Sequence, residues 1–418
     1  MNADKFHIHI KRFHQDFEAL AQIGATMEGG VHRPALSEAH LAARAWLRQR
    51  ILDAGLEFRC DGAGNHSAFL NCSAVGAPTL LLGSHLDSTP NGGRFDGALG
   101  VAAALEALRT VKEASLSLPV NLEAIDFTDE EGTLIGLTGS AALAGKLTQD
   151  DLQNPRGGRE ALMTGLARAG LSETQLLDAR RDPSTLAGYL ELHIEQGPRL
   201  LKAGIDIGIV TAIVGICSYR LSFVGRANHA GTTPMIDRLD AAQGASAFIL
   251  AARQTVVEEY PDCVANVGAL HLSPGAFNIV PERADLALEL RSSDLPTFER
   301  LEAALLQRAR VEAERFGLGL EIKFLGKHFP TPMSALVQQA IARAAEDWGL
   351  THMPLVSGAG HDAQSLASLC PTGMIFVPSQ GGASHSPREY TQWEDCVNGA
   401  NVLLGAALEL VKLISLIH

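Results

Sequence analysis

Residues 83–100 read GSHLDSTPNGGRFDGALG, and this stretch decides the fold of the chain. An apolar run, Leu80 to Leu82, leads into it, as a buried strand does when it reaches the carboxyl edge of a sheet. The glycine-rich loop that follows carries His85, Asp87 and Asp96. Polar side chains on such a loop, directly after a buried strand, are placed for chemistry rather than for packing. The stretch therefore predicts a functional site at one edge of a sheet.

Two further buried strands end in polar residues in the same way. The strand predicted over residues 120–127 runs into Thr-Asp-Glu-Glu-Gly at residues 128–132, and the strand predicted over residues 189–194 runs into Glu195 and Gln196. Helical patterns separate these strands. We therefore predict an α/β catalytic domain with a mainly parallel sheet, helices on both of its faces, and a site along one sheet edge.

The pattern changes in the middle of the chain. From about residue 203 to about residue 326 it predicts two strands, a long helix over residues 239–260, two strands, a second long helix over residues 296–316 and a last strand. A β-α-β-β-α-β core of this kind is similar to a ferredoxin-like α+β sandwich. We expect a catalytic domain built from residues 1–210 and 328–418, with residues 211–327 inserted as a second domain.

The composition limits the classes of function. The chain has 418 residues, a formal net charge of −13 and a hydrophobic content of 46%, which are values of an ordinary globular protein with an acidic balance. This charge argues against nucleic acid and anionic membranes as partners. The amphipathic first residues lack the apolar core of a signal peptide, and the six cysteines include no CxxC pair, so we expect a cytoplasmic protein with reduced thiols. The apolar run 401–418 is interrupted by Glu409 and Lys412, which predicts a packed amphipathic helix rather than a membrane span.

Several imidazoles and carboxylates lie at strand ends and in loops, namely His85, Asp96, Glu130, Glu131, His193 and His385. Each alone has an ordinary explanation, because a histidine after a strand is commonly a structural hydrogen-bonding group and adjacent glutamates are commonly solvated. Together they indicate a pair of divalent cations bridged by one carboxylate.

Asp96 is the natural bridge between two such cations, because it shares its loop with His85. His85 and His193 can serve one cation, and Glu131 and His385 the other. Mixed histidine and carboxylate ligands suit Zn²⁺, with Mn²⁺, Co²⁺ or Ni²⁺ as alternatives. If one of the adjacent glutamates binds metal, the other can act as a general base. Asp87 could orient the imidazole of His85.

The chain resembles the zinc-dependent amidohydrolases of the hydantoinase/carbamoylase family, which are related to dinuclear-zinc exopeptidases. These are N-carbamoyl-L-amino acid hydrolases, β-ureidopropionases and allantoate amidohydrolases. The resemblance covers essentially the whole chain and rests on seven motifs in order: GSHLDSTPNGGRFDGALG, DEEG, ELHIEQGP, ANHAGTTPM, FNIVP with ELR, SGAGHDA, and FVPSQGGASHSPRE. The resemblance implies that His85, Asp96, Glu131, His193 and His385 bind the metals, and that Glu130 is the general base.

The resemblance also implies roles for residues that their chemistry alone leaves unassigned. Arg291 and Asn278 would hold the substrate carboxylate, and Gln196 would contact the substrate beside the metals. The backbone of Gly358 and Gly360 would line the same pocket. His229 would polarise the scissile carbonyl in the neighbouring subunit, which requires a homodimer formed through the inserted lid domain.

The chain departs from the family pattern at two places. It reads Glu-Leu-Arg at residues 289–291, where the family often has Asp-x-Arg, and it lacks the aromatic residue that often follows the two glutamates. These differences leave the accepted side chain open. We expect hydrolysis of the ureido C–N bond of an N-carbamoyl-L-amino acid, with release of the amino acid, ammonia and carbon dioxide. The alternatives are an allantoate amidohydrolase, an exopeptidase or aminoacylase-like deacylase, and a metal-binding protein without activity.

Overall fold

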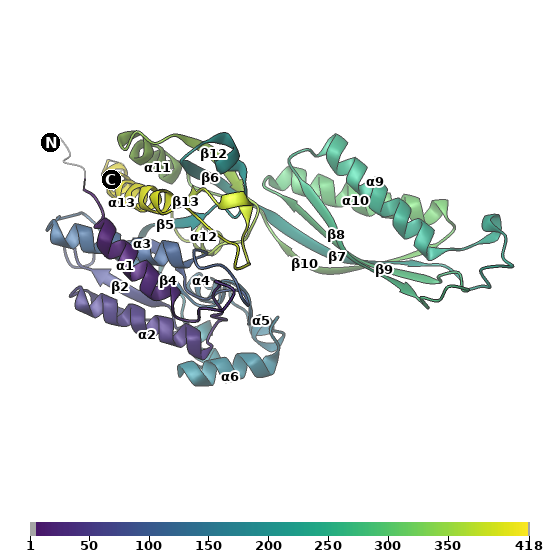
Figure 1. The fold of residues 1–418 in the computed structure, drawn as a ribbon, viewed down its shortest axis with the longest axis horizontal. Coiled ribbons are helices and arrows are strands. Elements are labelled where there is room, and N and C mark those ends of the chain that lie inside the picture. Colours follow the sequence, from purple (N-terminus) through teal and green to yellow (C-terminus); the bar gives the residue numbers. More distant parts are fainter. Residues whose placement is uncertain (1–5, 417–418) are drawn as a thin grey trace. The chain divides into compact units, whose positions relative to one another are not determined.

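The computed structural model describes residues 6–416, and the chain forms two compact units. Unit 1 comprises Met1–Thr211 and Met333–His418, and unit 2 comprises Ala212–Pro332. The first five residues of the amphipathic amino-terminal stretch and the last two residues of the predicted carboxyl-terminal helix lie outside the described residues. Figure 1 shows the elements of both units.

The large sheet has nine strands in the order β1-β2-β4-β3-β5-β13-β6-β11, and β12 pairs with β6 off this path. Its strands are β1 (Glu57–Cys60), β2 (His66–Leu70), β3 (Thr79–His85), β4 (Asn121–Phe127), β5 (Leu186–Ile194), β6 (Ile207–Ile213), β11 (Thr331–Pro332), β12 (His352–Ser357) and β13 (Thr372–Val377). The four central strands, β4, β3, β5 and β13, are parallel. The predicted α/β class with a mainly parallel central sheet is confirmed.

The helices of unit 1 are α1 (Ile10–Ala21), α2 (Glu38–Asp53), α3 (Ala98–Glu113), α4 (Thr138–Leu143), α5 (Gln149–Gln153), α6 (Arg159–Ala169), α7 (Glu173–Leu177), α8 (Arg199–Ala203), α11 (Ala335–Asp347), α12 (Asp362–Leu366) and α13 (Trp393–Ser415), with short 3-10 turns η1 (Pro183–Thr185) and η3 (Gln380–Gly382). Helices α1, α2, α3, α11 and α13 share one apolar core with one face of the sheet. Helices α4 and α12 pack together on the opposite face (Figure 1).

Local sequence explains where these helices begin and end. The Ser37 hydroxyl accepts a hydrogen bond from the backbone N–H of His40 and caps α2. Gly170 takes the left-handed conformation that ends α6. Helix α3 starts at Ala98, because residues 96 and 97 still belong to the loop after β3.

Helix α13 is the only described helix that is long and apolar enough to cross a membrane by length and composition. The mean hydropathy of its most apolar 18-residue window is 1.5, and 56% of that window is buried. Leu403, Leu404 and Leu410 are at most 1% exposed inside the core of unit 1. The helix therefore packs as a core helix, as its sequence predicted.

Unit 2 contains β7 (Gly215–Val224), η2 (Met235–Asp237), α9 (Ala241–Glu259), β8 (Val264–Ser273), β9 (Arg283–Ser292), α10 (Leu295–Arg315) and β10 (Gly319–His328). Its four strands form an antiparallel sheet in the order β10-β7-β9-β8. The two helices and the sheet enclose a separate apolar core that includes Phe223, Phe248 and Phe298. This is the predicted ferredoxin-like arrangement. Strand β6, the first of the two strands expected after residue 203, joins the large sheet instead.

Candidate metal and catalytic site

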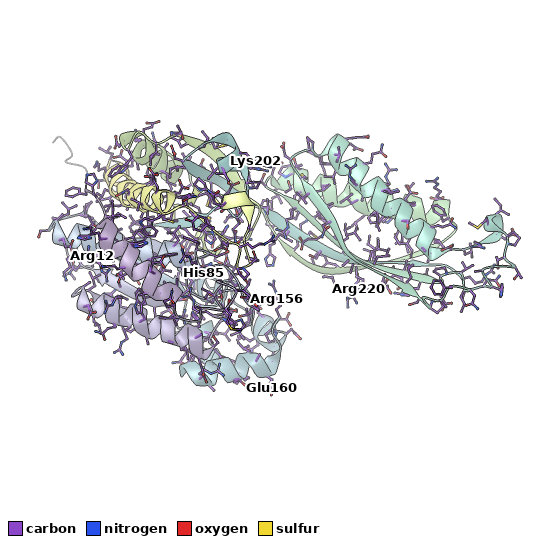
Figure 2. The ribbon with its side chains drawn as sticks, viewed as in Figure 1. Arg12, His85, Arg156, Glu160, Lys202 and Arg220 are labelled. Atoms are coloured by element: carbon purple, nitrogen blue, oxygen red, sulfur yellow. The ribbon has the colours of Figure 1, made fainter. Side chains whose placement is uncertain are left out.

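The site begins at the carboxyl end of β3, where His85 is the last residue of the strand and is fully buried. Strand β3 lies between β4 and β5, so the chain adds β4 on one side of β3 and later adds β5 on its other side. Such a switch point is the position where ligands bind in open α/β sheets. Figure 2 shows His85 inside unit 1, whereas Arg220 belongs to β7 of unit 2.

The loop after β3 brings Asp96 back against His85. Gly97 has a φ of +63°, and a Cβ atom at this position would lie 2.4 Å from the His85 ring. Only glycine permits this close approach in that conformation. As a result, one Asp96 carboxylate oxygen lies 3.5 Å from His85 Nε2.

His193, on the neighbouring strand β5, completes the first group of ligands. Its Nε2 atom lies 3.1 Å from the same oxygen of Asp96. The Nδ1 atoms of His85 and His193 lie 3.0 and 2.9 Å from the backbone carbonyl oxygens of Asp87 and Ile194. Each carbonyl accepts the proton on Nδ1, so the lone pair of each ring lies on Nε2, where a cation can bind. The Nε2 of His193 also accepts the backbone N–H of Gly97 at 3.3 Å.

The second group shares Asp96 with the first. The Nε2 atom of His385 lies 3.6 Å from the other Asp96 oxygen and 3.4 Å from an oxygen of Glu131. The His385 side chain is 53% exposed, whereas the other four residues are almost completely buried. The structure therefore brings the five predicted ligands together as two groups, with Asp96 common to both.

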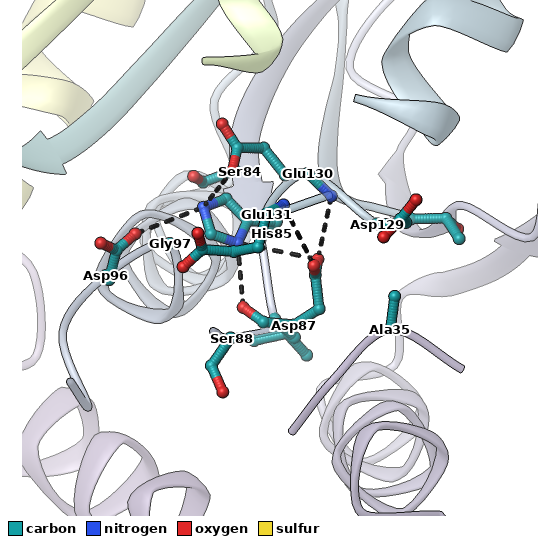
Figure 3. Close-up of polar contacts among 12 residues, drawn as sticks. Ala35, Ser84, His85, Asp87, Ser88, Asp96, Gly97, Asp129, Glu130 and Glu131 are labelled. Carbon is teal, nitrogen blue, oxygen red and sulfur yellow. Dashed lines mark hydrogen bonds and ion pairs between the residues drawn. The ribbon is translucent and has the colours of Figure 1, made fainter. Parts of the chain in front are cut away.

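The adjacent glutamates point to different partners. Glu130 directs a carboxylate oxygen to 3.5 Å from His85 Nε2, whereas Glu131 faces His385. Asp129, before them, has a φ of +55° and points away from His85, and its carboxylate accepts the backbone N–H groups of residues 134–136 (Figure 3). This loop conformation is strained for a residue other than glycine, and such strain is typical of functional sites.

Asp87 contacts His85 through its backbone carbonyl. Its backbone carbonyl, rather than its carboxylate, makes the short contact with His85, and the nearest carboxylate oxygen lies 3.7 Å from Nδ1. The carboxylate instead accepts the backbone N–H groups of Glu130 and Glu131, each at 3.2 Å. Asp87 therefore positions both glutamates as well as the histidine (Figure 3).

Burial and mutual charge shift the proton affinities of the whole cluster. Burial disfavours a charged His85, but Glu130, Asp96 and Asp87 outweigh burial and raise its pKa well above the usual value. Burial raises the pKa of Glu130 and of Glu131 well above their usual range. Burial acts in the same direction on Asp96, but the two histidines outweigh it and lower the pKa of Asp96 far below normal.

The donor set fits divalent cations. His85 Nε2 is buried and has no hydrogen-bond partner among the described residues, although carboxylate oxygens of Asp96 and Glu130 face it. A cation between these groups would satisfy the unpaired nitrogen and offset the repulsion among carboxylates. Imidazole nitrogen and carboxylate oxygen are ligands that Zn²⁺ accepts, and Mn²⁺, Co²⁺ and Ni²⁺ accept them as well.

Gln196 lies beside this cluster, as expected for a residue next to the metals. Its side-chain Nε2 donates to Asp96 at 2.7 Å, while its Oε1 atom is buried and has no partner among the described residues. Its φ of +55° is again unusual for a residue other than glycine. The amide thus holds Asp96 with one end and leaves the other end for a ligand.

The glycines of the SGAGHDA motif follow β12. A Cβ atom would meet nothing within 4 Å at Gly358, and only the tip of the Gln364 side chain at Gly360. The next residue, His361, is buried, and its ring centroid lies 4.6 Å from that of His193. The motif therefore reaches the cluster, and His361 is a site neighbour that sequence reasoning missed.

Glu389 is a second residue that sequence reasoning missed, although the last predicted motif contains it. It is 5% exposed, and its Oε1 atom accepts the backbone N–H groups of Phe95 and Asp96 at 2.9 and 3.1 Å. Burial, together with the Asp96 charge, raises the pKa of Glu389 to about 7. A glutamate in a polar loop gives no sequence signal for such a contact.

Three predicted residues belong to unit 2 and not to this cluster. His229 and Asn278 are exposed and lie on neighbouring segments, because the Ala230 N–H donates to the Asn278 carbonyl at 2.9 Å and His229 pairs with Ile279 as an isolated bridge. Arg291 is on β9 and pairs with Glu289 at 2.7 Å. Their roles toward a substrate stay predictions.

Comparisons with known proteins identify the class. Residues 81–409 match the model of peptidase family M20/M25/M40, so the chain belongs to this family of hydrolases. It is 37% identical over 404 residues to an N-carbamoyl-L-amino acid amidohydrolase of Geobacillus stearothermophilus, covering 96% of this chain and 98% of the relative.

A second relative and a solved structure are also similar to this chain. An allantoate amidohydrolase of Bacillus subtilis is 33% identical over 407 residues, covering 96% of this chain and 98% of the relative. The crystal structure of a hydantoinase/carbamoylase family amidase from Burkholderia multivorans superposes with a TM-score of 0.89 at 33% identity, covering 97% and 98% of the two chains. The predicted membership of the hydantoinase/carbamoylase group is confirmed.

Proposed function

We propose that this chain hydrolyses the ureido C–N bond of N-carbamoyl-L-amino acids in a two-cation site. The observation that carries the proposal is the pair of ligand groups joined by Asp96, with Glu130 facing the same space. The 37% identity with a relative named N-carbamoyl-L-amino acid amidohydrolase supports the substrate class. Zinc is the proposed metal, with manganese, cobalt or nickel as alternatives.

The chemistry divides between the cations and Glu130. When bound, the two cations lower the pKa of a water molecule and polarise the scissile carbonyl. Glu130 takes a proton from the attacking water and returns it to the departing nitrogen, so that ammonia leaves. The other product is the N-carboxy amino acid, which loses carbon dioxide to give the free amino acid. Asp87 holds the backbone of Glu130 in place through its carboxylate.

Substrate recognition is assigned to residues of both units. Arg291 and Asn278 of unit 2 hold the α-carboxylate, because a planar guanidinium suits bidentate binding of a carboxylate. The free Oε1 atom of Gln196 accepts an N–H of the ureido group.

We further propose a cytoplasmic homodimer formed through the inserted domain. His229 would then act on the carbonyl in the partner's site and help to stabilise the developing negative charge. Mixing chains that carry Glu130→Gln with chains that carry His229→Ala tests this arrangement. Heterodimers should regain part of the activity, because one of their two sites has both groups intact, and unchanged inactivity of the mixture would refute the action across the dimer.

A substrate panel tests the function itself. Ammonia release should be measured with N-carbamoyl-L-amino acids of different side chains, N-carbamoyl-β-alanine and allantoate, with Zn²⁺, Mn²⁺ or Co²⁺ added. We expect the highest kcat/KM with an N-carbamoyl-L-amino acid. Preference for allantoate would favour the function named for the Bacillus subtilis relative. Cleavage of peptides or acyl amino acids without turnover of any ureido compound would overturn the proposal.

A further inference from the structure

We propose that Glu389 is a positioning residue for the two-cation site. Its carboxylate ties the backbone of Phe95 and Asp96 to the loop that carries His385, and so keeps the shared ligand in register with the ligand of the second cation. The inference rests on the proposed metal site, and it concerns cation binding rather than the identity of the substrate.

The first observation is the pattern of hydrogen bonds around the Glu389 carboxylate. One oxygen accepts two consecutive backbone N–H groups, from Phe95 and from Asp96. Asp96 and Glu389 are 293 residues apart in the sequence. A carboxylate that accepts two adjacent backbone N–H groups fixes the orientation of that peptide segment. The segment is the one from which the Asp96 side chain extends toward both ligand groups.

The second oxygen connects to the other ligand loop. It lies 2.9 Å from the hydroxyl of Ser384, the residue before His385. The same hydroxyl lies 3.0 Å from the Asp96 oxygen that faces His385. Glu389, Ser384 and Asp96 therefore form a closed link between the two loops.

The third observation is the space that the chain leaves for this carboxylate. A Cβ atom at Gly93 would lie 1.9 Å from the Glu389 carboxyl carbon. Gly93 does not have a positive φ, so the backbone conformation alone does not demand glycine there. Close approach of the carboxylate does demand it. The glycine-rich loop is thus shaped around Glu389 as well as around His85.

Removal of the carboxylate should affect the ligands before it affects the chemistry. Without it, two buried N–H groups lose their acceptor, and the loop bearing Asp96 is free to shift. Partners that orient metal ligands typically contribute about 10- to 100-fold to metal affinity. Because Asp96 belongs to both ligand groups, we expect both cations to bind more weakly.

The test measures Zn²⁺ affinity by competition with a chelator, and bound Zn²⁺ per chain by mass spectrometry of the intact protein. Glu389→Ala should weaken Zn²⁺ binding about 10- to 100-fold. Glu389→Gln should restore most of the affinity, because its amide oxygen can still accept both N–H groups while its NH₂ group faces the Ser384 oxygen. Wild-type affinity of the alanine variant would overturn the inference, and so would equal losses in both variants, which would indicate a role of charge rather than of position.

A matched control and a second variant keep the test decisive. Asp61 also accepts two backbone N–H groups and a side-chain donor, but in the hairpin turn between β1 and β2, so Asp61→Ala should lower stability without weakening Zn²⁺ binding. Gly93→Ala should weaken Zn²⁺ binding by displacing the Glu389 carboxylate. This variant tests the inference even if Glu389→Ala does not fold. In the Glu389→Ala background it should add little further loss, and independent, additive losses would refute the link.

The design separates this inference from the proposed function. If the wild-type chain binds fewer than two Zn²⁺ ions, the proposed two-cation site fails. If the wild-type chain binds two and the Glu389 variants bind equally well, only the positioning role fails.

Discussion

The polar residues at the carboxyl edge of the large sheet and the predicted substrate-binding residues of unit 2 differ in their burial and in their contacts. In unit 1, His85, Asp87 and His193 are at most 1% exposed, and each contacts another member of the cluster. In unit 2, His229 and Asn278 lie on exposed segments, and the pairing of Arg291 with Glu289 is local. A buried, mutually fixed cluster suits bond-breaking chemistry, whereas exposed residues on a separate unit suit recognition that varies with the substrate.

Removal of the cations should give the largest effect, because it tests whether the buried cluster is the catalytic region. Treatment with a strong chelator should abolish ammonia release, with a loss of more than about 10³-fold, since the chain itself offers no substitute for the polarising charge. Added Zn²⁺, Mn²⁺, Co²⁺ or Ni²⁺ should restore activity to different extents. If the protein were fully active while mass spectrometry showed it to be metal-free, the buried cluster would not be the catalytic region.

The next test separates the two adjacent glutamates. Glu130→Gln should lower kcat about 10²- to 10⁴-fold, the usual contribution of a general base, and should keep both cations bound. Glu131→Gln should instead lower the number of bound cations, because Glu131 faces His385 rather than His85. Stopped-assay kinetics and intact-protein mass spectrometry distinguish the two outcomes. Loss of cations in the Glu130 variant would instead make Glu130 the metal ligand and Glu131 the general base.

Arg291 tests the recognition side of the comparison. Arg291→Ala should raise KM for an N-carbamoyl amino acid about 10- to 100-fold, since a hydrogen bond to a charged group contributes about 1.5–3 kcal/mol. It should have little effect on a substrate analogue in which the carboxylate is replaced by an uncharged amide. Arg220→Ala, at an exposed position of the neighbouring strand β7, is the control and should behave as wild type. An equal loss with the uncharged analogue would contradict the assignment.

The same contrast explains what could be predicted from sequence. The apolar runs of β3, β4 and β5 each end in polar residues, so both the strands and the edge that carries the ligands were predictable. Strand β12 was missed because its burial is irregular and a proline interrupts it, and helix α12 was missed because five residues are too few to show a helical period. The membership of β6 in the large sheet depends on long-range pairing with β13.

Within the site, the ligands at strand ends and in the motif loops were predictable, and residues that act only through contacts between two loops were not. His85 is the last residue of the buried strand β3 and His193 is the last but one of the buried strand β5, and that position distinguishes them from solvated histidines. Glu389 acts only because two loops, far apart in sequence, meet around Gly93. Which atom of Asp87 contacts His85 was not predictable for a similar reason, because the turn of the loop decides whether its carbonyl or its carboxylate faces the imidazole.

The smallest expected effect concerns acid stability, which should again divide the units. His66 of β2 is largely buried beside α2; burial and then Arg44 lower its pKa to about 3. An unfolded histidine takes up a proton near pH 6.5, so the folded state loses stability as the pH falls below that value, by about 2 kcal/mol at pH 5.

All three tryptophans, Trp46, Trp348 and Trp393, lie in unit 1, so their fluorescence reports its unfolding. In urea titrations at pH 7 and pH 5, His66→Gln should lose about 2 kcal/mol less than wild type between the two pH values, because glutamine does not titrate. His271→Gln, at an exposed position of β8 in unit 2, should lose as much as wild type. An equal pH dependence in all three proteins would show that His66 does not contribute to the acid sensitivity of unit 1.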